Sequence, residues 1–183
     1  MQPVYLIGFM GSGKTTLGNA LHGAAMPDGT ILTFVDLDHA IEQVEGMSVG
    51  DIFRQKGEDY FRRKEAATLR RLTVKPGIVV ACGGGTPCHS GNMEWMNAKG
   101  LTVLLQASEP VLLRRLIEGA HKRPLLAGLS TEELQRFIAD KQAQRMPHYS
   151  QAALTFNSDL LESAEDIAQS RRAFLNLLAT HMP

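Results

Sequence analysis

Short runs of apolar residues alternate along the chain with longer segments in which apolar residues recur every three or four positions. The short runs are bounded by glycine or polar residues, which is typical of buried strands. They cover residues 4–7, 31–35, 78–81, 101–105 and 153–156. The longer segments have helical spacing and cover about residues 14–25, 48–72 with a break at Gly57, 91–98, 110–118, 131–145 and 164–179.

Strands that alternate with helices predict an α/β fold, a three-layer sandwich with a central five-stranded parallel sheet and helices on both faces. A chain of 183 residues is long enough for one such domain, and we expect residues 1–183 to form a single unit. Residues 119–128, "GAHKRPLLAG", have a glycine at each end with two cations and a proline between them. This composition predicts a mobile lid.

The charge balance narrows the choice of partners. The chain has 19 basic and 19 acidic residues, and this net charge of zero argues against binding to nucleic acid or a membrane surface. The only cysteines, Cys82 and Cys88, match neither a common zinc pattern nor a disulfide framework. No apolar stretch is long enough to cross a bilayer. We therefore expect a cytoplasmic protein.

The first glycine-rich segment, "LIGFMGSGKTT", contains Gly8-x-x-x-x-Gly13-Lys14-Thr15 between a predicted strand and a predicted helix. This is the P-loop pattern, in which backbone N–H groups and the helix N-terminus hold nucleotide phosphates. Lys14 is expected to reach the β- and γ-phosphates, and the Thr15 hydroxyl to bind Mg²⁺. The residues expected to contact ATP here are Gly11, Ser12, Gly13, Lys14, Thr15 and Thr16.

Two carboxylates follow in "FVDLDHAIE", where Asp36 and Asp38 end the second predicted strand. Residues at the carboxyl ends of strands line the ligand crevice of an open α/β sheet. If the extended geometry continues, both side chains lie on one side of the backbone. Asp36 can then support the Mg²⁺ shell through water while Asp38 faces an acceptor hydroxyl. The alternative is that one of them only caps the next helix. The sequence has no base-reading Asn-Lys-x-Asp motif, so a GTPase is a poor fit.

A second glycine-rich segment, "ACGGGTPC", follows the third predicted strand. Three successive glycines indicate that something must approach the main chain closely. Arg62 and Glu65, in the helical segment before this strand, have i, i+3 spacing. Such a pair can hold a guanidinium in one orientation for a carboxylate, although a solvated helix face is the alternative.

Taken in order, "GFMGSGKTTLG", "DLD", "SVGDIF", "KGEDYFRRKE", "CGGG", "RPLLAG" and "RMPHYSQAA" resemble shikimate kinases over about residues 3–157. The block Gly-Glu-x-x-Phe-Arg-x-x-Glu followed by the triple glycine is the most specific part. The chain departs from the family in "LHGAAMPDGTILTF", which is several residues longer than expected. The first helix is therefore expected to end early, with an added turn around residues 27–30.

The resemblance implies roles for further residues. Asp38 would hydrogen-bond the hydroxyl groups of shikimate, and Arg62 and Arg145 would hold its carboxylate. Glu65 would orient Arg62, and Gly84 and Gly85 would offer main-chain N–H groups from the floor of the acceptor pocket. Arg123 would enter with the lid, and a segment of about residues 37–72 would bind the substrate. Arg115 would meet the adenine, with Arg114 as the alternative.

The resemblance also implies the reaction, which is transfer of the γ-phosphoryl group of ATP to the 3-hydroxyl of shikimate in aromatic amino acid (chorismate) biosynthesis. Lys14, Asp38 and Arg123 would be the catalytic residues, Mg²⁺ the cofactor, and ATP and shikimate the only partners of a monomeric enzyme. A gluconate or nucleotide kinase would share the P-loop and lid but would not need Arg62, Arg145 and the triple glycine. A non-catalytic ATP-binding module would be expected to lack Lys14, Thr15 or Asp38, and all three are present.

Overall fold

A five-stranded sheet forms the centre of the protein. The computed structural model describes residues 1–72, 75–119, 126 and 128–181. The strands are β1 (Val4–Ile7), β2 (Thr33–Asp36), β3 (Ile78–Ala81), β4 (Leu101–Gln106) and β5 (Leu154–Asn157). Their order is β2-β3-β1-β4-β5 and every neighbouring pair is parallel, which confirms the predicted parallel sheet.

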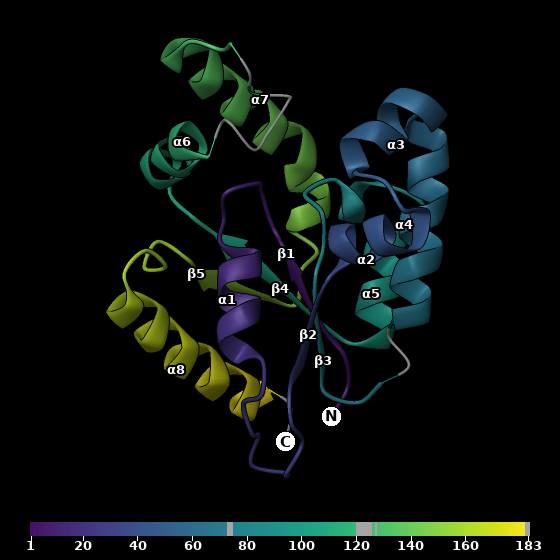
Figure 1. Cartoon of the computed structure of the whole chain (residues 1–183). Helices are drawn as coiled ribbons and strands as arrows, with labels where there is room; N and C mark the ends of the chain where they lie inside the picture. Colours follow the sequence, from purple (N-terminus) through teal and green to yellow (C-terminus); the bar gives the residue numbers. More distant parts are fainter. Residues whose placement is uncertain (73–74, 120–125, 127, 182–183) are drawn as a thin grey trace.

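Helices cover both faces of the sheet (Figure 1). They are α1 (Lys14–Leu21), α2 (Leu37–Glu45), α3 (Val49–Lys56), α4 (Glu58–Leu72), α5 (Asn92–Lys99), α6 (Glu109–Glu118), α7 (Thr131–Tyr149) and α8 (Ala164–His181), with a 3₁₀ turn η1 (Thr86–Cys88). Side chains alternate along β1, so Val4 and Leu6 pack in the cluster that includes α1 and α8, whereas Tyr5 and Ile7 pack in the cluster that includes α2 to α5. The predicted α/β sandwich is confirmed.

The connection between α1 and β2 differs from the predicted helix over 14–25. Helix α1 ends at Leu21, and the chain then reverses, with a bridge between Ala25 and Ile31 and a hydrogen bond from the N–H of Met26 to the carbonyl oxygen of Thr30. Pro27 and Gly29 disfavour a helix here, while Met26 is buried in the core. The added turn around residues 27–30 is therefore confirmed.

Helix α2 was not among the predicted helical segments, and the extended geometry considered through Asp38 does not occur. The strand ends at Asp36, whose side chain caps α2 by accepting from the N–H groups of Asp38 and His39. Ile41 is buried on the inner face of the helix. Gly46 ends the helix in the left-handed conformation at φ 67°. Asp38 thus lies in the first turn of a helix.

Helix α7 begins at Thr131, as predicted, after a capping box formed by Ser130 and Glu133, but it continues past Arg145 to Tyr149. Pro147 lies within its last turn, where a proline costs one backbone hydrogen bond. Burial of the Tyr149 ring among the core residues favours this extension. Within the described ranges, no helix has the length and apolar character needed to span a membrane.

Candidate active site

The P-loop wraps around the lysine that follows it. Gly8, Gly11 and Gly13 have φ values of 137°, 81° and 89°, which glycine adopts without strain. The Lys14 ammonium donates to the carbonyl oxygens of Gly8 and Phe9, each at 2.8 Å. Burial lowers the pKa of Lys14 to about 8, and the nearby Asp38 carboxylate opposes this shift. A polyanion in the loop would favour the charged ammonium further.

Thr15 and Asp36 meet at the edge of this loop. The Thr15 hydroxyl donates to Oδ2 of Asp36 at 2.8 Å, while Oδ1 of Asp36 caps α2. Asp36 therefore caps the next helix, which was the alternative considered, while its other oxygen lies beside Thr15, where the Mg²⁺ role is expected. The two side chains offer hard oxygen donors, and no cluster of three or more His, Cys, Asp or Glu residues that could hold a metal occurs in the described ranges. Such a site fits Mg²⁺, which keeps several waters and takes few protein ligands beside phosphates.

Asp38 presents an unused acceptor. Its Oδ1 atom is buried and has no hydrogen-bond partner among the described residues. Burial raises the pKa of Asp38 to about 6, helped by the neighbouring charges of Asp36 and Glu65 and opposed by Lys14. A buried oxygen without a donor costs free energy, so it indicates a place for a ligand donor such as a hydroxyl group.

The triple glycine lies under three functional side chains. None of the glycines at positions 83–85 has a positive φ, so the need for a left-handed backbone does not explain why glycine occurs there. A Cβ atom added at Gly83 would lie 3.0 Å from Oδ1 of Asp38, one at Gly84 would lie 2.7 Å from Nη1 of Arg145, and one at Gly85 would lie 2.8 Å from Nη2 of Arg62. A side chain at Gly84 or Gly85 would require the arginine to shift, because real Cβ contacts are essentially never shorter than 3.0 Å, and one at Gly83 would press tightly on Asp38.

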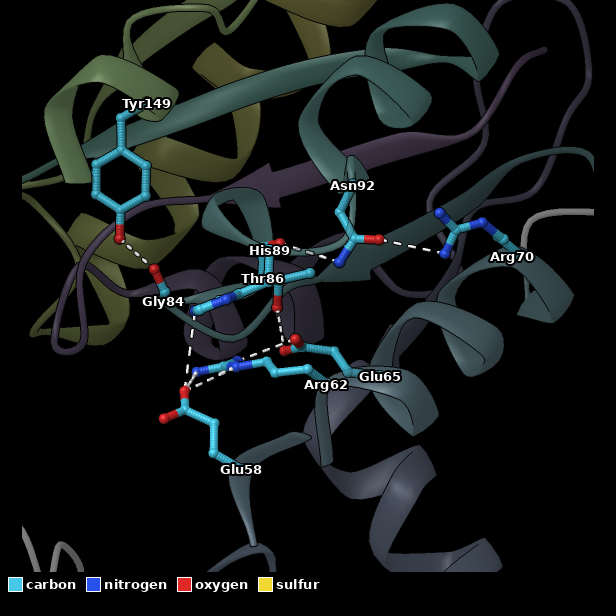
Figure 2. Close-up of polar contacts among 9 residues, drawn as sticks. All are labelled: Glu58, Arg62, Glu65, Arg70, Gly84, Thr86, His89, Asn92 and Tyr149. Carbon is cyan, nitrogen blue, oxygen red and sulfur yellow. Dashed lines mark hydrogen bonds and ion pairs between the residues drawn. The ribbon is translucent and has the colours of Figure 1, made fainter. Parts of the chain in front are cut away.

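Arg62 is held by two carboxylates, as Figure 2 shows. Its Nη1 donates to Glu65 at 3.0 Å, and its Nε and Nη2 donate to Glu58 at 3.1 and 3.0 Å. Glu65 is buried and also accepts from the Thr86 hydroxyl at 2.6 Å. The predicted pairing of Arg62 with Glu65 is therefore present. Glu58 was missed, although its i, i+4 spacing to Arg62 could have revealed it.

Arg145 reaches the same turn from α7. Its guanidinium lies over the ring of Phe9 at 5.5 Å, and its Nη1 atom is buried without a hydrogen-bond partner among the described residues. Arg62 and Arg145 are 83 positions apart in the sequence, yet both contact the triple glycine. A buried guanidinium nitrogen and a buried carboxylate oxygen, both without a hydrogen-bond partner among the described residues, indicate a site for a ligand with an anionic group and a hydroxyl group.

The nucleotide side is a cavity of about 640 Å³ at the carboxyl edge of the sheet. Its lining includes the P-loop, Asp36, Asp38, Gly83, Gly84 and Arg115. Arg115 donates to the carbonyl oxygens of Gly11, Ser158 and Asp159, whereas Arg114 forms an exposed ion pair with Glu162. Of these two arginines, only Arg115 faces the cavity. Arg62, Glu65, Gly85 and Arg145 are not among the lining residues and instead surround the adjoining turn. Arg123 and most of the expected lid at 119–128 lie outside the described residues.

The P-loop at the end of the central strand, the oxygen donors beside it and the adjoining anion site together define a P-loop kinase for a small molecule. A family model described as "Shikimate kinase" matches residues 10–176. The chain belongs to the shikimate kinase family and is an ATP-dependent kinase.

Relatives and solved structures agree with this assignment. The chain is 39% identical over 178 residues to a shikimate kinase of Parabacteroides distasonis. The match covers 97% of this chain and 100% of the relative. It is similar to the crystal structure of shikimate kinase from Bacteroides thetaiotaomicron, with a TM-score of 0.88 and 38% identity over 97% of this chain and 98% of the other. It is also similar to the shikimate kinase from Acinetobacter baumannii solved in complex with shikimate, with a TM-score of 0.78 and 28% identity over 100% and 96% of the two chains.

Proposed function

We propose that the residues assembled here transfer the γ-phosphoryl group of ATP to the 3-hydroxyl of shikimate. The observation that carries this proposal is the convergence of Arg62, Arg145 and the unpaired oxygen of Asp38 on three successive glycines beside the P-loop. A cyclohexene carboxylate with several hydroxyl groups has the complementary chemistry, with one anionic group for the arginines and hydroxyl groups for the aspartate.

At the nucleotide end, the backbone N–H groups of residues 11–16 hold the phosphates and Lys14 reaches the transferred group. Thr15 and, through water, Asp36 would hold a Mg²⁺ ion. When bound, that ion would neutralise charge on the phosphate oxygens. Arg115 meets the adenine side of the cavity, a placement supported by its contacts with the P-loop and residues 158–159. Arg123 is assigned to the transferred phosphoryl group by family resemblance alone.

At the acceptor end, Arg62 and Arg145 hold the carboxylate, and Glu65 fixes the orientation of Arg62. Gly84 and Gly85 bring main-chain N–H groups against the ring because they carry no side chains. Asp38 accepts a hydrogen bond from the reacting hydroxyl, which orients that oxygen toward the γ-phosphorus. Because the pKa of Asp38 is about 6, the carboxylate is ionised at neutral pH and can also accept the proton. Phosphoryl transfer depends mostly on positioning and charge stabilisation, which these residues supply.

The whole chain acts in this proposal as one P-loop kinase domain in a cytoplasmic, monomeric enzyme. Residues 37–72 carry Asp38, Arg62 and Glu65 and so form the substrate-binding segment, and residues 119–128 form the lid. Closure of a lid would exclude water and suppress hydrolysis of ATP.

A coupled assay of ADP release tests this proposal with shikimate, quinate, gluconate and nucleoside monophosphates as acceptors. We expect turnover with shikimate at saturating Mg-ATP and at most slow turnover with the others. Omission of Mg²⁺ should abolish turnover. Faster turnover with gluconate or a nucleotide than with shikimate would refute the assignment of the acceptor site.

A further inference from the structure

The triple glycine forms a β-turn whose central peptide joins two glycines. The N–H of Thr86 donates to the carbonyl oxygen of Gly83 at 3.0 Å, so residues 83–86 are the four positions of the turn. Gly85 has φ −93° and ψ −13°, which are the values of the third position of a type I turn. The central peptide therefore joins the Gly84 carbonyl to the Gly85 N–H.

A turn with this sequence has two accessible conformations. A type II turn keeps the hydrogen bond between the first and fourth positions but needs φ near +80° at the third, which glycine adopts without strain. The two turn types differ by a rotation of the central peptide, which reverses both the Gly84 carbonyl and the Gly85 N–H. The absence of side chains at Gly84 and Gly85 therefore leaves this peptide free to rotate unless another group holds it.

Tyr149 holds the Gly84–Gly85 peptide in place through its hydroxyl group. Its hydroxyl donates to the carbonyl oxygen of Gly84 at 2.6 Å, and its ring is buried at 2% exposure at the end of α7 (Figure 2). No other hydrogen bond to this oxygen is present in the described part of the chain. Burial raises the pKa of Tyr149 to about 12, so the hydroxyl keeps its proton and remains a donor across the neutral range.

We propose that Tyr149 is a positioning residue that locks the Gly84–Gly85 peptide in the type I conformation and so aims the Gly85 N–H at the acceptor. In a trans peptide the carbonyl and the following N–H point in opposite directions. Fixing the Gly84 oxygen toward Tyr149 therefore fixes the Gly85 N–H on the opposite side. This inference rests on the proposed function, in which that N–H contacts shikimate.

The same helix also supplies Arg145, one turn before Tyr149. The Arg145 guanidinium lies against Gly84, with Nη1 at 2.7 Å from an ideal Cβ position, while the tyrosine holds the carbonyl of the same residue. Helix α7 thus contacts Gly84 at two points. The Tyr149 hydroxyl also interacts with the Arg145 side chain. Loss of the hydroxyl therefore leaves the arginine in place but removes one of its neighbours, so the conformation of the Gly84–Gly85 peptide has to be measured directly as well.

The test compares Tyr149→Phe with Tyr60→Phe. Tyr60→Phe also removes one tyrosine hydroxyl, which here donates to the carboxylate of Glu45 at 2.8 Å, at a place away from the turn. We expect Tyr149→Phe to weaken shikimate binding in calorimetry by about five- to tenfold, the loss typical of one hydrogen bond between neutral groups. Neither variant should change the affinity for ATP measured without shikimate. Equal shikimate affinity in Tyr149→Phe and wild type would overturn the proposal.

A second measurement distinguishes positioning from general stability. The amide resonances of ¹⁵N-labelled, substrate-free protein should show Gly84 and Gly85 in one conformation in wild type and in Tyr60→Phe. In Tyr149→Phe these two resonances should broaden or double as the peptide flips. Unchanged turn resonances combined with a lower melting temperature would mean that Tyr149 only stabilises the core, and would also overturn the proposal.

A third measurement needs no variant and applies even if Tyr149→Phe does not fold. Crystal structures of the wild-type protein with and without shikimate should both show a type I turn, with the Tyr149 hydroxyl bonded to the carbonyl oxygen of Gly84. A type II turn in the shikimate complex would refute the inference. Failure of wild type to bind shikimate in the calorimetry would instead refute the proposed function. The resonance test in substrate-free protein remains decisive for the turn itself in that case.

Discussion

The replacement of Arg62 by lysine tests whether the acceptor site depends on the shape of the guanidinium or only on its charge. A guanidinium has five N–H donors, and three of those of Arg62 already donate to Glu58 and Glu65. Two N–H groups therefore remain for the carboxylate of a ligand. A lysine ammonium has three donors on one atom, and it cannot contact both glutamates and also present two parallel donors.

The expected loss follows from the burial of the side chain. Removing one partner of a buried, hydrogen-bonded charge pair costs about 2–5 kcal/mol. The Arg62 side chain is 17% exposed. We therefore expect Arg62→Lys to fall in the lower part of that range, about 2–3 kcal/mol. This corresponds to a loss of about 30- to 150-fold in shikimate affinity.

Titration calorimetry with shikimate measures this loss, and Arg63→Lys is the matched control. Arg63 is exposed on the same helix and forms no ion pair among the described residues. ATP affinity without shikimate should stay at the wild-type value in both variants. Wild-type shikimate affinity in Arg62→Lys would refute the carboxylate-binding role of Arg62, and a parallel loss of ATP affinity would place Arg62 at the nucleotide instead.

Three further perturbations separate the other parts of the site. Lys14→Ala should lower kcat by about 10²–10³-fold with an unchanged circular dichroism spectrum, because a donor aimed at the transferred group is lost; an unchanged kcat would contradict the P-loop assignment. For Asp38, whose pKa is raised to about 6, kcat/KM should fall tenfold per pH unit below that pH, as the carboxylate is protonated. Because its pKa is raised in the folded protein, Asp38 stabilises the folded state fully below its unfolded pKa of about 4, and this stabilisation is lost as the pH rises through about 6. Asp38→Asn should therefore raise the melting temperature at pH 8 and leave it unchanged at pH 3.5. Gly84→Ala should weaken shikimate binding in calorimetry because its Cβ would lie 2.7 Å from Nη1 of Arg145 and would shift this guanidinium, whereas Gly50→Ala, where the nearest atom is 3.8 Å away, should bind normally.

The strands were predictable because buried strands of a parallel sheet are continuous apolar runs, as in Val4–Ile7 and Ile78–Ala81. Helix α2 was missed because two aspartates separated by one residue were interpreted as an extended pair. The capping position of Asp36 and the glycine at position 46 were the signals for a helix between them.

The P-loop site was predictable because its function is local and lies within eight consecutive residues. The acceptor site was predictable only in part. The pairing of Arg62 with Glu65 follows from helical spacing, but the approach of Arg145 depends on how α7 packs across the turn. Tyr149 was not found because the predicted helix ended at residue 145, and a hydrogen bond to a main-chain carbonyl leaves no mark on the sequence.

The two glycine-rich turns serve the site through different physical effects. In the P-loop the glycines adopt positive φ values, so the loop closes around its own lysine. In the second turn the φ values are ordinary, and the glycines are needed because Asp38, Arg62 and Arg145 occupy the space of the missing side chains. Alanine is therefore disfavoured in the first turn by backbone strain and in the second by contact with the ligand-binding groups. A chain that lost the acceptor function could accept side chains in the second turn and still bind ATP. The presence of all three glycines together with both arginines thus favours a working acceptor site over an ATP-binding module without an acceptor.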